Sequence, residues 1–333
     1  MDMGVSISLV LLILVALAFD FMNGLHDAAN SIATIVSTRV LKPQYAVVWA
    51  AFFNFAAFFV FGVHVANTVG KGIVDPGLVD DPLIFGALMG AISWNAITWW
   101  GGIPSSSSHA LIGGIVGAGV AKAGFSAVIW SGLSKTVSAI VISPFTGFVL
   151  ALLLILLVSW AFVRANPAFA DGFFRKSQLV SAALYSLGHG SNDAQKTAGI
   201  IAVLLYSHGV YSEFTVPGWV ILSCYTVMGL GTLMGGWRIV HTMGSKITRL
   251  TPMQGSCAET AGAITLFGAT YLGIPVSTTH TITASIVGVG AARRVSAVRW
   301  NVATGIVYAW VITMPAAALL AAVFYWLAAL FAG

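Results

Sequence analysis

The chain has 333 residues, of which 58% are hydrophobic and only 8% are charged, and its formal net charge is +5. A soluble globular protein carries about a quarter charged residues, so this composition excludes that class and favours a protein embedded in a lipid bilayer. The positive charge does not point to a nucleic-acid partner. Most basic residues fall in short clusters between apolar segments, which is the pattern expected at a membrane surface.

A membrane-spanning helix needs about 20 mainly apolar residues. In chain order, the first half offers segments at residues 4–23, 44–64, 82–100, 105–121 and 136–163. The second half offers segments at residues 178–207, 217–235, 254–272, 276–291 and 301–331. Residues 164–177 form the longest polar connection and divide the chain into 1–163 and 178–333. We therefore expect an all-α integral membrane protein with five spans on either side of a cytoplasmic linker.

Two pairs of motifs indicate that the second half repeats the first. Residues 102–119, GIPSSSSHALIGGIVGAG, match residues 273–290, GIPVSTTHTITASIVGVG, at nine of eighteen positions. Residues 24–31, GLHDAANS, match residues 190–197, GSNDAQKT, and keep Gly, Asp and Ala in register. Both pairs lie about 170 residues apart and occur in the same order, as one duplication requires.

The charges of the connecting segments predict the orientation. Basic residues occur around 39–42, in 164–177, in 238–249 and in 293–299, so these segments are expected on the cytoplasmic side. The segment 65–81 is acidic and 208–216 has Glu213 as its charged residue, so both are expected outside. Five spans place both termini outside and reverse the second half. This is an inverted repeat, which many secondary transporters have.

Polar residues recur at helical spacing inside the apolar segments. The first half has Asp20, Asn23, Asp27 and Asn30, and the second half has Ser186, His189, Asp193 and Lys196 at the same spacing. Spacings of three and four place each set on one face of a helix, and intramembrane ionisable groups usually mark function. Gly24 and Gly190 lie within these stripes and are candidate helix breaks.

The hydroxyl clusters predict an anion site. Pro104 and Pro275 cannot continue a preceding helix, so the residues after them begin new helices near the membrane midplane. A helix start offers free N–H donors and a partial positive charge, which suit a phosphate-like anion. Capping alone needs one hydroxyl at each start. The predicted anion-binding residues are Ser105, Ser106, Ser107, Ser108, Ser277, Thr278, Thr279, Asn192 and Lys196.

The acidic residues predict a second ligand, because carboxylates beside a dianion repel it unless a cation or proton lies between them. The expected co-substrate is Na⁺, H⁺ or a divalent metal, and no covalent cofactor is expected. The predicted coupling residues are Asp20, Asn23, Asp27, Asn30, Asp193 and Glu259, the last of which has no visible partner in the sequence.

At these motifs the chain resembles the inorganic phosphate transporter (PiT) family of secondary carriers. GLHDAANS and GSNDAQKT resemble its paired G-x-N-D signatures, and GIPVSTTH resembles its Pro-Val-Ser-Thr-Thr-His motif. The resemblance implies an inverted-repeat fold in the plasma membrane, commonly dimeric, that carries phosphate with Na⁺ or H⁺. It also implies that Asp27, Asn30, Asn192, Asp193 and the hydroxyl clusters line the transport site.

His26 stands where many relatives have Asn. In this feature the first half resembles the bacterial low-affinity branch of the family. That resemblance implies coupling to H⁺ and transport of phosphate together with a divalent metal. Two alternatives stay open. A sulfate permease of the same fold would use the same hydroxyls, although phosphate keeps a proton that Asp can accept and sulfate does not. A membrane hydrolase would need one Ser–His–Asp set, whereas here the polar sets are duplicated.

Overall fold

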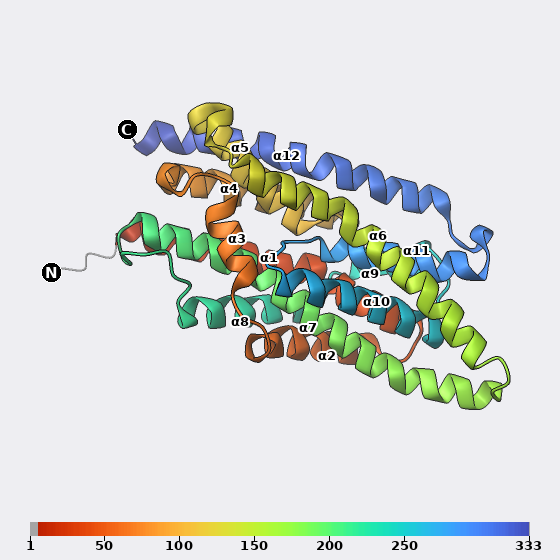
Figure 1. Ribbon diagram of the computed structural model, residues 1–333. Helices are drawn as coiled ribbons and strands as arrows, with labels where there is room; N and C mark the ends of the chain where they lie inside the picture. Colours follow the sequence, from red (N-terminus) through yellow and green to blue (C-terminus); the bar gives the residue numbers. More distant parts are fainter. Residues whose placement is uncertain (1–5, 333) are drawn as a thin grey trace.

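The computed structural model describes residues 6–332, and every regular element in that range is helical (Figure 1). Residues 1–5 and 333 lie outside the described residues, and so do the first positions of the predicted segment 4–23. Five helices are long and apolar enough to cross a membrane, namely α1 (Ile7–Ser37), α4 (Asp81–Gly101), α5 (Ser107–Ala123), α6 (Trp130–Ala161) and α12 (Trp300–Ala332). Two bent helix pairs raise this number to seven when each pair is counted as one span.

The bent pairs interrupt the second span of each half. In the first half α2 (Pro43–Ala56) and the short helix η1 (Ala57–Phe59) are followed by α3 (His64–Gly72) at an angle of 83°. In the second half α8 (Gly218–Met234) is followed by α9 (Trp237–His241) and the π-helical turn η4 (Thr242–Lys246) at 63°. The remaining elements are η2 (Pro76–Leu78), η3 (Gly124–Ala127), α7 (Pro167–Ser207), α10 (Pro252–Tyr271), α11 (Thr278–Arg293) and η5 (Val295–Ala297).

Each of the ten predicted segments coincides with one or more helices, and two boundaries differ by more than ten residues. Helix α1 continues past residue 23 to Ser37 and carries the whole polar stripe. Helix α7 begins at Pro167, so most of the predicted linker 164–177 forms its first turns. Asn166 caps this helix by accepting a hydrogen bond from the N–H of Ala168, and proline is favoured at the first helical position.

The predicted helix breaks at Gly24 and Gly190 are wrong, because α1 and α7 run through both positions without interruption. These glycines are points of close helix packing. A Cβ atom on Gly24 would lie 2.2 Å from the carbonyl oxygen of Met228 in α8, and one on Gly190 would lie 2.3 Å from that of Asn54 in α2. Small residues allow such close backbone approach between membrane helices.

Corresponding helices of the two halves run in opposite directions. Figure 1 shows that α6 and α12, the last helix of each half, run in opposite directions along the molecule. Each packs mainly on the other half, α6 against α10 and α11 and α12 against α4 and α5. Both helices contain a proline at the matching position, Pro144 and Pro315. The two inverted repeats therefore interlock rather than fold as separate bundles.

Two helical hairpins, α4–α5 and α10–α11, enter the molecule from opposite ends, and their turns lie inside it (Figure 1). Gly102 and Gly273 begin the turns with positive φ angles of 63° and 68°, a conformation that glycine adopts without a Cβ penalty. The prediction of interrupted helices that meet in the interior is confirmed. Each hairpin returns to the end of the molecule where it began. Its two helices therefore do not alter the predicted opposite orientation of the second half.

The predicted basic segments gather largely at one end. The α6–α7 and α11–α12 turns lie opposite the end where α1 begins and α12 ends (Figure 1), and Arg175 donates a hydrogen bond to the carbonyl of Arg39. Arg238 departs from this pattern, since it contacts the carbonyl and ring of Trp100 at the end of α4. Lys122 lies beside the acidic segment 65–81, where it forms an ion pair with the carboxylate of Asp80.

The close approach of α1 and α8 predicts the effect of adding one methyl group. Gly24→Ala should destabilise the protein by about 1–3 kcal/mol, because backbone atoms of α8 occupy the space that the methyl group needs. Gly268→Ala is the matched control, since no atom lies within 4 Å of the added Cβ and alanine favours the helix. Thermal unfolding of both variants in detergent checks this. Equal midpoints would show that the α1–α8 contact tolerates a side chain.

Candidate functional site

The hydroxyl clusters form the first turns of α5 and α11. Ser106 and Ser277 are the N-cap residues, and their Oγ atoms accept hydrogen bonds from the N–H groups of His109 at 3.2 Å and His280 at 3.1 Å. Capping therefore engages one hydroxyl of each cluster, as expected for serine before a helix. Among the remaining hydroxyls, Ser105 donates to Thr98 in α4. The others face the polar stripes of α1 and α7, and they are Ser107, Ser108, Thr278 and Thr279.

Asp27 is the centre of the contacts on α1. Its Oδ2 atom accepts a hydrogen bond of 2.7 Å from Ser107, whose hydroxyl also lies 2.6 Å from Oδ1 of Asn23. Its Oδ1 atom lies 2.7 Å from Nδ1 of His26 and 3.5 Å from the hydroxyl of Thr279. The carboxylate is buried and joins α1 to the tips of both hairpins.

Asp193 occupies the matching place on α7. Its Oδ2 atom accepts a hydrogen bond of 3.1 Å from Thr278 and lies 3.1 Å from Nε2 of His189. Its Oδ1 atom accepts from Nζ of Lys196, which also donates to Ser108 and to the carbonyl of Val276. An ammonium group has three donors, so Lys196 uses all of them inside the protein.

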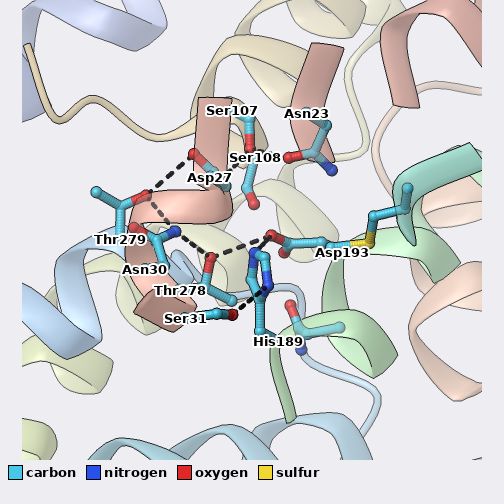
Figure 2. A network of polar contacts seen from close by, with 12 residues as sticks. Asn23, Asp27, Asn30, Ser31, Ser107, Ser108, His189, Asp193, Thr278 and Thr279 are labelled. Carbon is cyan, nitrogen blue, oxygen red and sulfur yellow. Dashed lines mark hydrogen bonds and ion pairs between the residues drawn. The ribbon is translucent and has the colours of Figure 1, made fainter. Parts of the chain in front are cut away.

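The fourth residue of each stripe contacts the hairpin of the other half. Asn30 in α1 donates hydrogen bonds of 3.1 Å to Thr278 and 2.9 Å to Thr279, while Lys196 in α7 reaches Ser108. Figure 2 shows the resulting network, in which side chains from α1, α5, α7 and α11 converge. The structure therefore brings most of both predicted stripes and most of both hydroxyl clusters into one buried site. Ser186 is not part of the network, because its hydroxyl donates to the carbonyl of Ala182 within α7.

Three buried residues of this site could hold a cation. Ligand atoms of Asp27, His189 and Asp193 all lie within 4.8 Å of one another. Lys196 supplies one positive charge for the two carboxylates. Two carboxylates so close together in a buried site repel each other unless a proton or cation lies between them. Oxygen ligands suit hard cations, and an imidazole extends the choice to transition metals.

Asn192, which was predicted to bind the anion, holds the turn of its own hairpin. Its amide donates to Thr270 at 3.1 Å and to the carbonyl of Ile274 at 3.2 Å, while its Oδ1 atom accepts from the N–H of Val276. His26 at the matching position contacts Thr98 at 3.1 Å and Ser105 at 3.4 Å in the other hairpin. These two residues position the hydroxyl clusters.

Asp20 makes its contact with α7, one oxygen accepting a hydrogen bond of 3.0 Å from Thr197. Its other oxygen is buried and has no hydrogen-bond partner among residues 6–332.

Glu259 in α10 belongs to a separate buried cluster, although no partner is visible in the sequence. It accepts hydrogen bonds from Thr34 in α1 and from Gln178 and Ser181 in α7.

Several residues of the network were not predicted. Ser31 and Thr34 lie four residues after Asp27 and Asn30, so an extended reading of the α1 stripe would have found them. His189 was part of the predicted stripe, but it was not assigned a role in coupling. Gln178, Ser181 and Thr98 carry no such signal, because their position depends on how the helices pack.

A model of the phosphate transporter family matches the chain twice, at residues 23–170 and 164–321. The two matches cover both halves of the duplicated site. The chain belongs to this family. Members of the phosphate transporter family are transporters, so the alternative of a membrane hydrolase is wrong.

Individual members of the family align over nearly the whole chain. A probable low-affinity inorganic phosphate transporter of Rhizobium meliloti is 72% identical over 97% of both chains, and one of Bacillus subtilis is 47% identical over 96% of both. A solved structure described as the sodium-dependent phosphate transporter is 27% identical with a TM-score of 0.89 and covers 98% of this chain and 100% of its own.

The buried Lys196–Asp193 pair predicts strong coupling between the two residues. Lys196→Met should destabilise the protein by about 3–5 kcal/mol, because it leaves a buried carboxylate without its cation. Adding Asp193→Asn should restore part of that loss. Lys122→Met breaks the more exposed pair with Asp80 and should cost at most about 1 kcal/mol. Thermal unfolding of wild type, Lys196→Met, Asp193→Asn, the double variant and Lys122→Met tests this. Losses that simply add in the double variant would contradict it.

Proposed function

We propose that this protein imports inorganic phosphate across the cytoplasmic membrane by symport with a cation, using alternating access. The observation that supports this most is the meeting of two inverted hairpin tips with the polar stripes of α1 and α7 in one buried site. Inverted repeats that bind their ligands near the midplane are typical of secondary transporters. The relatives named as probable low-affinity inorganic phosphate transporters support phosphate as the substrate.

We propose that the phosphate binds between the two hairpin tips. The hydroxyls of Ser107, Ser108, Thr278 and Thr279 would exchange their present acceptors for phosphate oxygens, and Lys196 would contribute a charge-assisted hydrogen bond. The N-termini of α5 and α11 add their N–H donors. The other predicted residues, Ser105, Ser106, Ser277 and Asn192, would act mainly by holding the turns in place.

We propose that the coupling cation binds at Asp27, His189 and Asp193. Two carboxylates and an imidazole within 4.8 Å provide the ligands for a divalent metal, and the carboxylates alone can hold a proton or Na⁺. The related solved structure is described as a sodium-dependent transporter, which supports a co-transported cation. Asn23 and Asn30 would position the carboxylates, and Asp20 and Glu259 are further candidates for proton or cation coupling.

The contacts between halves suggest how phosphate and cation are linked. Asn30 and Lys196 each connect one stripe to the opposite hairpin, so a movement of either hairpin must break these contacts. A bound phosphate can bridge the same groups only if a cation offsets Asp27 and Asp193. The occluded, movable state then requires both ligands, which is the condition for symport.

We further propose that the basic end faces the cytoplasm, so that both chain ends face outward. The positive-inside rule supports this orientation, because arginines gather around the α10–α11 hairpin base and the turns at the same end. Localisation in the inner (plasma) membrane and a homodimeric state follow from the resemblance and remain predictions.

Uptake into proteoliposomes tests the proposed function. Labelled phosphate should accumulate when an inward H⁺ gradient, an inward Na⁺ gradient or added Mg²⁺ is imposed, and the condition that drives accumulation identifies the coupling ion. Sulfate at the same concentration should not compete, because it lacks the proton that the site can share at neutral pH. Equal competition by sulfate would favour the sulfate permease. Absence of uptake under every gradient would contradict the proposal.

Neutralising Asp27 should separate binding from coupling. Asp27→Asn keeps the shape of the side chain and removes its charge, so gradient-driven uptake should be lost while part of the phosphate binding persists. Asp193→Asn should also lose gradient-driven uptake but bind phosphate more weakly, because Lys196 places the second half nearer the anion. Asp171→Asn, an exposed carboxylate paired with Arg175, is the control and should transport normally. Normal gradient dependence in both site variants would leave the carboxylates a structural role.

A further inference from the structure

A polar hollow of about 410 Å³ lies at the basic end, at the base of the α10–α11 hairpin. Its walls come from the α9–α10 and α11–α12 connections, the first turn of α10 and the last turn of α11. They include Thr248, Gln254, Ser296 and four arginines, namely Arg249, Arg293, Arg294 and Arg299. Among residues 6–332, no carboxylate lies within ion-pair distance of these four guanidinium groups. The hollow thus concentrates positive charge without an internal counter-ion.

The walls of the hollow are fixed by hydrogen bonds between the two connections. The backbone N–H of Arg299 donates to the carbonyl of Ile247 at 2.9 Å, and the hydroxyl of Thr248 donates to the carbonyl of Ala297 at 3.0 Å. Gln254 completes a capping box with Thr251 at the start of α10. The arginines therefore extend from a defined frame rather than from a free loop.

The inverted repeat contains the same frame at the opposite end of the molecule. There the N–H of Ile129 donates to the carbonyl of Ile73 at 2.9 Å, and Val128 is buried as Val298 is. Asp80 caps α4 as Thr251 caps α10, each accepting from the N–H three residues later. Lys122 occupies the last turn of α5, as Arg293 does in α11.

The two frames differ in how they balance this basic residue. At the base of α4–α5, Lys122 donates to the carboxylate of Asp80 and to the carbonyl of Leu78. At the base of α10–α11, the position of Asp80 is Thr251 and the position of Leu78 is Arg249. The second frame has thus lost the acid that balances the first and gained cations. The positive-inside rule requires basic residues near the cytoplasmic membrane surface, but it does not require them to line one hollow.

We propose that this hollow binds a phosphate-type oxyanion, either the headgroup of an anionic phospholipid or free inorganic phosphate. Guanidinium groups bind phosphate through paired hydrogen bonds, and the volume lies within the range of small-molecule sites. Anionic lipids are also concentrated at the membrane surface where this end would lie. The oxyanion takes the place that Asp80 fills in the first repeat.

Binding at this place would act on the hairpin that carries Thr278 and Thr279. Arg249 and Gln254 belong to the α10 side of its base, and Arg293 and Arg294 to the α11 side. An anion between them removes the repulsion of the guanidinium groups and joins the two helices. The inference concerns this base and stands whether or not the proposed symport is correct.

Thermal unfolding of the purified full chain in detergent tests the site. The probes are dihexanoyl phosphatidylglycerol, dihexanoyl phosphatidylcholine as the zwitterionic lipid, and inorganic phosphate. The variant is R249Q/R293Q, and the control is R164Q/K176Q, which removes two exposed charges from the same end outside the hollow. Because both variants keep the hairpin tips intact, any stabilisation by phosphate at the tips is common to both.

We expect phosphatidylglycerol or inorganic phosphate to raise the unfolding midpoint of wild type and control. R249Q/R293Q should need about tenfold or more of the same probe for an equal rise, since each lost hydrogen bond to a charged group weakens binding by that order. If the midpoint rise of R249Q/R293Q is weaker than that of the control with phosphatidylglycerol alone, the hollow is a lipid site. If it is weaker with inorganic phosphate, the hollow is a site for the free anion. Equal responses of both variants to every probe would overturn the proposal. If R249Q/R293Q does not fold, R249Q alone is compared with R164Q by the same criterion.

Discussion

Non-helical backbone buried in the middle of the molecule is the constraint on which the rest of the structure depends, because lipid cannot hydrogen-bond to it. The turns of both hairpins receive their partners from the protein. Thr68 in α3 donates to the carbonyl of Gly273, and Thr242 in η4 donates to that of Gly102. Each interrupted span thus stabilises the hairpin turn of the other half. The breaks after α2 and α8 place these hydroxyls at the required depth, and they explain why the two repeats interlock instead of forming separate bundles.

The same requirement places ionisable groups at the centre. Val276 needs partners for its N–H and its carbonyl, and it finds them in Asn192 and Lys196. The ammonium group of Lys196 then needs the carboxylate of Asp193, whose second oxygen accepts from Thr278. A chain of contacts therefore leads from backbone satisfaction to a charged site. The groups that hold the hairpin turns are also those proposed above to bind phosphate and a cation. Bound ligands would therefore replace protein contacts and leave few polar groups unsatisfied.

How far the sequence allows prediction depends on whether a feature is local. Helix starts at Ser106 and Ser277, the stripe on α1 and the duplication follow from spacing and local chemistry, and the structure agrees with each. The role of Gly24 could not be predicted in this way, since a glycine signals a break or a close contact and only the position of Met228 decides between them. The partners of Glu259 come from α1 and α7, far away in sequence, and no period in α10 indicates them.

The positions at which the repeats differ carry information that their shared frame does not. Two inverted copies of one fold need the same caps, glycines and turn contacts, and these are largely retained. They do not need Lys196 where the first half has Asn30, His189 where it has Asn23, or Thr251 where it has Asp80. The first two differences put the added ammonium group and the added imidazole on α7, so the two sides of the buried site are chemically unequal although their geometry is similar. In a symmetric site, the anion could bind beside α1 and the cation beside α7, or the reverse, with equal affinity. In an unequal site, the anion and the cation each have one preferred side. Each ligand then has a fixed position relative to the other, and this lets the binding of one determine the binding of the other.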